Sequence, residues 1–151
     1  SAEQAAAAVA ATRYAPAGVR SYGPLRADLG LDPAGHEARA TVFAMVETAR
    51  GLAALDEICA VPGLSGIYVG PADLAICLGH RPAQAWTAPV VQEAIARIHA
   101  TAAAAGLITG VHAGAGVPGK AMARLGFQMI TLASETQALR RGVAEHLREA
   151  Q

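Results

Sequence analysis

Four short apolar runs, separated by segments of helical character, limit the folds that are open to this chain. The runs cover residues 41–46, 66–69, 108–111 and 129–132, and each of the last three follows a helix-like segment that ends near a glycine. A continuous apolar run bounded by turn residues is typical of a strand in a parallel sheet covered by helices. The order therefore predicts an α/β fold whose strands lie side by side, joined by right-handed crossovers.

Helix signals lie between and around these runs. Residues 2–12 are rich in alanine, the strongest helix former, and a proline and a glycine within residues 14–18 end that helix. Residues 18–35 are rich in Gly, Pro, Asp and Arg and predict a long loop before the first strand. Further helices are expected over 51–60 and over 120–125, the latter stopped by Gly126. Another is expected between the cap Thr87 and the stop Gly106, with Pro89 in its first turn. A last helix is expected after the capping box of Ser134 and Gln137.

Four parallel strands are too few to close a barrel, whereas eight strands can close one. We therefore expect either a small open α/β sheet or half of a (β/α)8 barrel. The 151 residues and the 53% hydrophobic content are enough for one ordinary domain with a large buried core or a large interface.

The charge and hydropathy patterns argue against several classes of partner. The 12 basic residues balance the 12 acidic residues, and no basic run could attract nucleic acid or an anionic membrane. No stretch reaches the roughly 18 apolar residues that a membrane span needs. The alanine-rich start also lacks the basic region of a signal peptide. We therefore expect a cytoplasmic protein with neither a nucleic-acid nor a membrane partner.

Cysteine, tryptophan and methionine side chains are expected to have packing roles. Cys59 and Cys77 lack the spacing of zinc ligands, and free cysteines are usually buried. Trp86 and Met122 do not stand at a spacing that would single out a binding site.

Two carboxylates follow neighbouring apolar runs. Glu47 comes directly after the first run, and Asp73 follows the second run, 26 positions later (73 − 47). The carboxyl ends of parallel strands are where α/β proteins place their chemistry. Two such oxygen donors suit Mg²⁺ or Mn²⁺. On the residues alone, structural roles are as open as metal binding. Glu47 could be an acid at a helix N-terminus, and Asp73 could be a helix cap or a turn residue.

Three further residues could reach a ligand. His112 ends the third run at the same rim, where neighbouring glycines could cradle an anion or simply form the turns beside a hydrogen-bonded loop histidine. Arg20 and Arg26 lie in the long loop, where they could bind an acidic group of a substrate or be solvated.

The chain resembles the HpcH/HpaI aldolases, a family of metal-dependent pyruvate aldolases, over residues 2–149. The combination of Glu47-Thr48 with Gly70-Pro71-Ala72-Asp73-Leu74 at this spacing is the most specific part of the resemblance. The segments that match the family pattern are residues 2–5, 14–20, 46–48, 55–58, 66–74 and 125–128.

The resemblance implies a (β/α)8 barrel of which residues 1–151 cover about the last four β/α units. It implies that Glu47 and Asp73 hold a divalent Mg, Mn or Co ion, and that the backbone NH groups of Ala72 and Asp73 bind the pyruvate carboxylate. The implied reaction is reversible aldol cleavage of a 4-hydroxy-2-oxo acid into pyruvate and an aldehyde, in a homo-oligomer.

The resemblance assigns no catalytic residue within this chain. In the family, the histidine and the arginine that act on the substrate lie on the first four strands, which precede the matching region. None of the five histidines here stands at a corresponding position. Met45 stands where some relatives have a glutamine near the metal.

Two alternatives accompany this interpretation. One is a carbon–carbon lyase of the citrate-lyase-β or malyl-CoA-lyase type, which shares the barrel and the acidic metal site. The other is a non-catalytic half-barrel or assembly module, because half a barrel leaves two sheet edges and an apolar surface uncovered.

Overall fold

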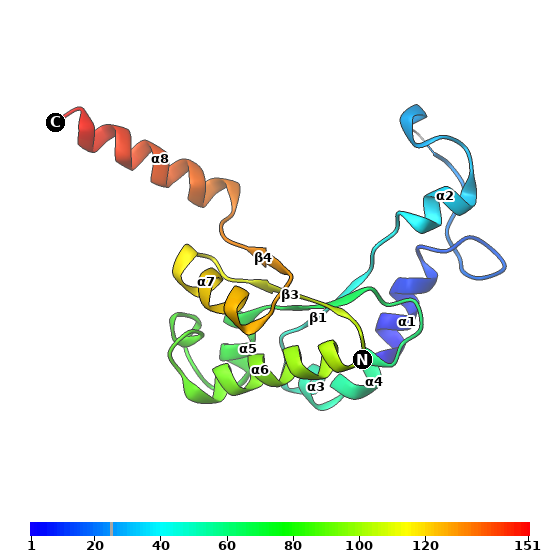
Figure 1. Cartoon of the computed structure of the whole chain (residues 1–151), viewed down its shortest axis with the longest axis horizontal. Coiled ribbons are helices and arrows are strands. Elements are labelled where there is room, and N and C mark those ends of the chain that lie inside the picture. The colour runs from blue at the N-terminus through cyan, green and yellow to red at the C-terminus, as the bar shows by residue number, and fades with distance from the viewer. Residues whose placement is uncertain (25) are drawn as a thin grey trace.

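The computed structural model describes residues 1–24 and 26–151, and it contains the parallel sheet that the sequence predicts (Figure 1). All neighbouring strands pair in parallel, in the order β1-β2-β3-β4. The first strand starts two residues later than expected, the third includes His112, and the fourth ends one residue earlier. The strands are β1 (Phe43–Val46), β2 (Gly66–Val69), β3 (Ile108–His112) and β4 (Met129–Thr131).

Helices connect these strands and lie largely on one side of the sheet (Figure 1). Helix α6 packs on both β2 and β3 and also contacts α4 and α5. In the described part of the chain, no helix combines the length and the apolar character that crossing a bilayer requires. The helices are α1 (Ala2–Ala10), η1 (Ala27–Leu29), α2 (Pro33–Ala38), α3 (Ala49–Ala53), α4 (Leu55–Cys59), α5 (Pro71–Cys77), η2 (Pro82–Gln84), α6 (Pro89–Ala104), α7 (Gly116–Leu125) and α8 (Glu135–Glu149).

Several helix boundaries differ from the expected ones. The helix expected over 51–60 is divided into α3 and α4 at Ala54, whose ψ of 17° turns the chain so that Leu55 is fully buried. The N-cap of α6 is Ala88 rather than Thr87, although Pro89 occupies the first turn as predicted. Helix α7 begins at Gly116, four residues before the expected start.

The capping signals near the C-terminus are confirmed. The Ser134 side chain accepts a hydrogen bond from the Gln137 amide, and the Gln137 side chain accepts one from the Ser134 amide. Gly126 ends α7 in the left-handed region, with a φ of 109°. Helix α8 then extends away from the sheet (Figure 1), and three of its apolar side chains, Leu139, Val143 and Leu147, are exposed.

The segment expected to be one long loop contains η1 and α2. Asp32 caps α2 by accepting hydrogen bonds from the amides of Ala34 and Gly35, and Pro33 occupies its first position. His36 is buried, donates to the Gly30 carbonyl and bonds the Tyr14 hydroxyl. The bond to Tyr14 ties the segment to the residues that follow α1.

The two faces of the sheet have different surroundings. Successive side chains of a strand point to opposite faces, so the register assigns each residue to one of them. The face that the helices cover, called the helix face below, comprises Ala44, Val46, Ile67, Val69, Thr109, Val111 and Ile130. The open face comprises Phe43, Met45, Gly66, Tyr68, Ile108, Gly110, His112, Met129 and Thr131.

The core lies between the helix face and the helices. Val46, Ile67 and Val69 have no exposed surface, and neither do Ile95 and Ile98 of α6. The one buried hydroxyl on this face, that of Thr109, is bonded at 2.9 Å to His99 Nδ1 of α6. The Thr109 hydroxyl is therefore paired inside an apolar layer.

The packing roles predicted for cysteine, tryptophan and methionine are confirmed in three cases of four. Met122 and Cys59 are buried, and Trp86 packs against the core while partly exposed. The prediction was wrong for Cys77, which is exposed at the end of α5. The buried stripe of that helix comprises Pro71, Leu74 and Ala75, and the position of Cys77 lies outside it.

Candidate active site

The structure brings the two predicted carboxylates into one cavity. Val46 and Val69 are paired in the sheet, so β1 and β2 end at the same edge. Glu47 follows β1 directly, and Asp73 lies in the first turn of α5, which begins two residues after β2. The cavity has a volume of about 210 Å³ and is lined by Met45, Glu47, Tyr68, Gly70, Pro71, Ala72, Asp73 and His112.

Glu47 lies against a glycine that makes room for its carboxylate. A Cβ atom on residue 70 would overlap with Glu47 Oε2, so a side chain there would displace the carboxylate. Gly70 is also the N-cap of α5, and the Asp73 side chain does not cap that helix. Glu47 itself precedes the Thr48 cap of α3 and is not part of that helix. Glu47 therefore lies just outside α3, and Asp73 is an acid in the first turn of α5 without capping it.

The electrostatic setting of the pair is unfavourable for two negative charges. Burial raises the pKa of Glu47, and the charge of Asp73 raises it further. Among the residues that line the cavity there is no lysine or arginine. Within the described ranges, 1–24 and 26–151, neither carboxylate has a side-chain hydrogen bond. A cation in this cavity would relieve the repulsion between the two acids.

The donor set suits a hard divalent ion that retains open coordination positions. Carboxylate oxygens are the ligands that Mg²⁺ and Mn²⁺ prefer, and Mg²⁺ is often bound through only one or two protein carboxylates. Groups of three or more His, Cys, Asp and Glu side chains with metal-binding geometry do not occur among the described residues. Of the residues that line the cavity, Glu47 and Asp73 are the two with carboxylate oxygens.

The backbone beside Asp73 is open to a small anion. Ala72 and Asp73 are the second and third residues of α5, and both are exposed. The first amides of a helix have no acceptor within the helix. Ala72 and Asp73 both line the cavity, so the free amides of this helix start lie beside it.

Tyr68 lines the cavity and was missed by the sequence analysis, as was its hydrogen-bond partner Thr131, which is outside the cavity lining. The Tyr68 hydroxyl donates a hydrogen bond of 2.8 Å to Thr131 Oγ1, so the ring spans from β2 across β3 to β4. Gly110 makes this possible, because a Cβ there would lie 2.7 Å from Tyr68 Cδ2. The signal in the sequence was the glycine inside an apolar strand, which marks the close approach of another group.

His112 lines the same cavity from the end of β3. It is exposed, it is paired with Thr131 in the sheet, and it lies on the same face as Met45 and Tyr68. The expectation that His112 reaches the rim of the site is therefore confirmed.

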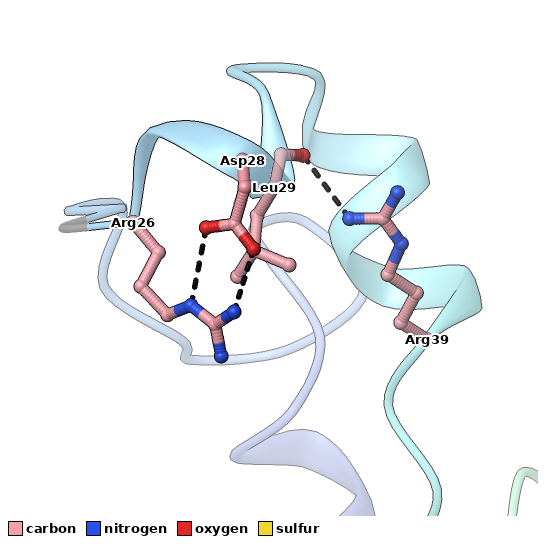
Figure 2. Close-up of polar contacts among 4 residues, drawn as sticks. All are labelled: Arg26, Asp28, Leu29 and Arg39. Atoms are coloured by element: carbon pink, nitrogen blue, oxygen red, sulfur yellow. Dashed lines mark hydrogen bonds and ion pairs between the residues drawn. The ribbon is translucent and has the colours of Figure 1, made fainter.

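Arg20 and Arg26 lie elsewhere. They line a separate cavity of about 530 Å³ together with Arg39 and His36. Figure 2 shows that Arg26 pairs with Asp28, at 2.6 Å, and that Arg39 donates to the Leu29 carbonyl. The Arg20 guanidinium lies 4.8 Å from the centre of the Tyr14 ring. Neither of the two arginines singled out from the sequence lines the cavity of Glu47 and Asp73.

The match to a protein family covers most of the chain. A family model described as HpcH/HpaI aldolase/citrate lyase matches residues 1–141. A hydroxypyruvate/pyruvate aldolase of Rhizorhabdus wittichii is 38% identical over 133 residues, which are 85% of this chain and 53% of that protein. The chain thus spans about half the length of the curated relatives that it matches.

Solved structures show the same relationship. An HpcH/HpaI aldolase/citrate lyase family protein from Burkholderia cenocepacia has a TM-score of 0.86 and 31% identity, over 99% of this chain and 61% of that one. The protein CitE of Mycobacterium tuberculosis, solved in complex with magnesium and acetate, has a TM-score of 0.55 and 27% identity, over 66% of this chain and 47% of that one.

Proposed function

The chain belongs to the HpcH/HpaI aldolase/citrate lyase family, and from this premise we propose that it supplies the carboxylate side of a metal-dependent aldolase active site. The reaction is reversible aldol cleavage of a 4-hydroxy-2-oxo acid into pyruvate and an aldehyde. The observation that carries the proposal is that Glu47 and Asp73, from neighbouring strand ends, share one cavity whose lining includes no basic side chain other than His112.

Glu47 and Asp73 would hold a divalent Mg, Mn or Co ion. The raised pKa of Glu47 and the glycine beside its carboxylate support this assignment, as does the magnesium described for the M. tuberculosis relative. When bound, such an ion supplies Lewis-acid polarisation of a carbonyl oxygen.

The other residues of the cavity would position the substrate. The amides of Ala72 and Asp73 would bind the pyruvate carboxylate, and the small side chain of Ala72 would let it approach. The Tyr68 ring, fixed by its bond to Thr131, would close one side of the cavity against water.

We assign no catalytic acid or base within residues 1–151. Four of the five histidines lie outside the lining of the cavity, and His36 and His99 already have partners in the fold. In the proposed whole protein, the four strands that complete a (β/α)8 barrel would carry the proton-transferring histidine and the arginine. The exposed apolar side chains of the open face, Met45, Ile108 and Met129, support such a completion.

The decisive experiment is a calorimetric titration of this chain with Mn²⁺, with and without pyruvate. We expect Mn²⁺ to bind, to bind more tightly when pyruvate is present, and to lose its binding in Glu47→Gln. Glu93→Gln is the matched control, because Glu93 is exposed on α6 and away from the cavity. Unchanged Mn²⁺ binding in both Glu47→Gln and Asp73→Asn would refute the proposal.

A citrate-lyase type of reaction is the second candidate, because the matching family includes citrate lyases and the M. tuberculosis protein shares part of the fold. The higher identity to the R. wittichii hydroxypyruvate/pyruvate aldolase, 38% against 27% for the M. tuberculosis protein, favours the aldolase. Cleavage assays with a 4-hydroxy-2-oxo acid and with malyl-CoA distinguish the two reactions. The absence of metal binding and of both activities would leave a non-catalytic module.

A further inference from the structure

We propose that the second cavity, lined by Arg20, Arg26 and Arg39, binds a small phosphate ester. Its volume is about 530 Å³, and the buried His36 also lines it. Among the described residues of its lining there is no aspartate or glutamate, and none that also lines the candidate active site. The inference is therefore independent of the proposed aldolase function, and its test needs no metal.

The acidic side chains near this cavity have partners within the fold. Residues 20–40 contain three acids. Asp32 accepts hydrogen bonds from two amides at the start of α2, and Glu37 accepts one from a main-chain amide that follows α1. Asp28 accepts two hydrogen bonds from the guanidinium of Arg26. The fold therefore already uses each of these carboxylates.

The lining keeps an excess of positive charge. Within the part of the chain that the structure describes, Arg20 and Arg39 form no ion pair. With Asp28 set against Arg26, two guanidinium charges of the three remain uncompensated (3 − 1). The hydrogen bond from Arg26 lowers the pKa of Asp28 most, and the charge of Arg39 lowers it further, so both groups act on one place. Like charges gathered in one cavity repel each other, and a bound anion relieves that repulsion.

Each guanidinium group is held by a contact with the fold and keeps further N–H groups for a ligand. The Arg20 guanidinium lies 4.8 Å from the centre of a tyrosine ring, and Arg39 donates only Nη1, to the Leu29 carbonyl. Figure 2 shows Arg26 and Arg39 both bonded to the short helix η1, Arg26 through Asp28. A guanidinium has five N–H donors. Donors that are already held in place lose little conformational freedom when a ligand binds.

The charge and the size of the cavity favour a phosphate ester over other anions. A phosphate monoester carries a charge of about −1.5 to −2 at neutral pH and three strongly accepting oxygens. That charge matches the excess of two guanidinium groups, whose planar forks bind phosphate oxygens in pairs. Pro24, Leu29 and Ala40 give the lining an apolar part, which is suited to the carbon portion of an ester.

The test is a calorimetric titration of the metal-free chain with glycerol 3-phosphate, inorganic phosphate and succinate. We expect glycerol 3-phosphate to bind more tightly than inorganic phosphate, because its carbon portion contacts the apolar part of the lining. Succinate is a dicarboxylate of similar charge, and it should bind roughly 3- to 10-fold more weakly than glycerol 3-phosphate. Arg39→Gln and Arg20→Gln should each weaken the binding of glycerol 3-phosphate roughly 10-fold or more, the range of a charge-assisted hydrogen bond.

A gain of affinity provides a result that misfolding cannot imitate. Asp28→Asn removes the carboxylate that neutralises Arg26 and should tighten the binding of glycerol 3-phosphate severalfold. Arg97→Gln is the matched control, because Arg97 is exposed on α6 and does not line the cavity, and it should leave the affinity unchanged. The proposal is overturned if neither phosphate compound binds, if succinate binds as tightly as glycerol 3-phosphate, or if Arg39→Gln has the same affinity as Arg97→Gln.

Discussion

The two faces of the sheet come from the same strands but have opposite surroundings. On the helix face, Val46, Ile67 and Val111 have no exposed surface. On the open face, Met45 is 56% exposed and Met129 is 46% exposed, although both are apolar. The exposed fractions of neighbouring residues thus change abruptly along one strand, from Met45 to Val46.

The difference separates the face that is packed into the core from the face that carries the candidate site. Parallel sheets are normally covered on both faces, because their strands are apolar throughout. The helix face meets that requirement with α6 and its neighbours. The open face instead carries glycines, aromatic rings and the polar side chains of the candidate site. Its remaining apolar residues are suited to a cover from other strands or from a second copy.

The largest expected effect distinguishes the two faces by their stability. Ile67→Ala on the helix face should lower the free energy of unfolding by about 2–5 kcal/mol, because it leaves a cavity in a closed core. Met45→Ala on the open face should cost about 0.5 kcal/mol or less, as for other exposed positions. Urea unfolding measures both. A Met45→Ala cost as large as that of Ile67→Ala would show that the open face is covered in solution.

A smaller effect tests the ring that lies across β3. Gly110→Ala should lower the free energy of unfolding by about 1–3 kcal/mol, because the new methyl group would push against Tyr68. Gly142→Ala on α8 is the matched control. No atom lies near a Cβ at that position, so the change should leave stability unaltered or raise it by up to about 1 kcal/mol. An equal effect of the two substitutions on urea unfolding would contradict this account of Gly110.

The open face also predicts self-association. Met129→Lys places a charge among the exposed apolar side chains of that face and should weaken any dimer by about tenfold, the equivalent of about 1.4 kcal/mol. Sedimentation velocity over a range of protein concentrations measures the change. Leu139→Lys on α8 tests the other exposed apolar surface. If only Leu139→Lys dissociates the oligomer, the helix rather than the sheet forms the contact.

The sequence predicted those features that depend on local pattern. The apolar runs specified the strands, and the spacing of Glu47 and Asp73 specified that they would meet, because neighbouring parallel strands end at one edge. Contacts that depend on register could not be predicted in this way. Tyr68 and Thr131 are 63 residues apart and meet only because β2, β3 and β4 pair as they do and because Gly110 lacks a side chain.

Local signals also misled where two of them competed. Thr87 is a better N-cap residue than Ala88, but Pro89 prefers the first helical position, and this makes Ala88 the cap. The Asp32-Pro33 cap of α2 was hidden in a segment whose glycines and prolines suggested a loop. In both places, one residue carried the signal that mattered.

The smallest expected effect concerns the pKa of Glu47. It separates the stability that the chain loses by holding the Glu47 charge near Asp73 from the proposed role of Glu47 in metal binding. Because burial and Asp73 raise this pKa, the folded chain binds a proton more readily than the unfolded chain. The stability of the chain should therefore fall as the pH rises through the range between the unfolded and the folded pKa. Glu47→Gln should remove this dependence and be slightly more stable at neutral pH, by less than about 1 kcal/mol.

Divalent metal should reverse the order of stability of the original chain and Glu47→Gln. Mn²⁺ at saturating concentration binds only the folded state of the original chain, so at neutral pH the original chain should become more stable than Glu47→Gln. As the pH falls, protons compete with the ion at the raised pKa of Glu47, and the advantage should be lost. Urea midpoints across pH, with and without Mn²⁺, measure both effects. If the original chain and Glu47→Gln had the same urea midpoint under every condition, Glu47 would neither interact electrostatically with Asp73 nor bind the metal.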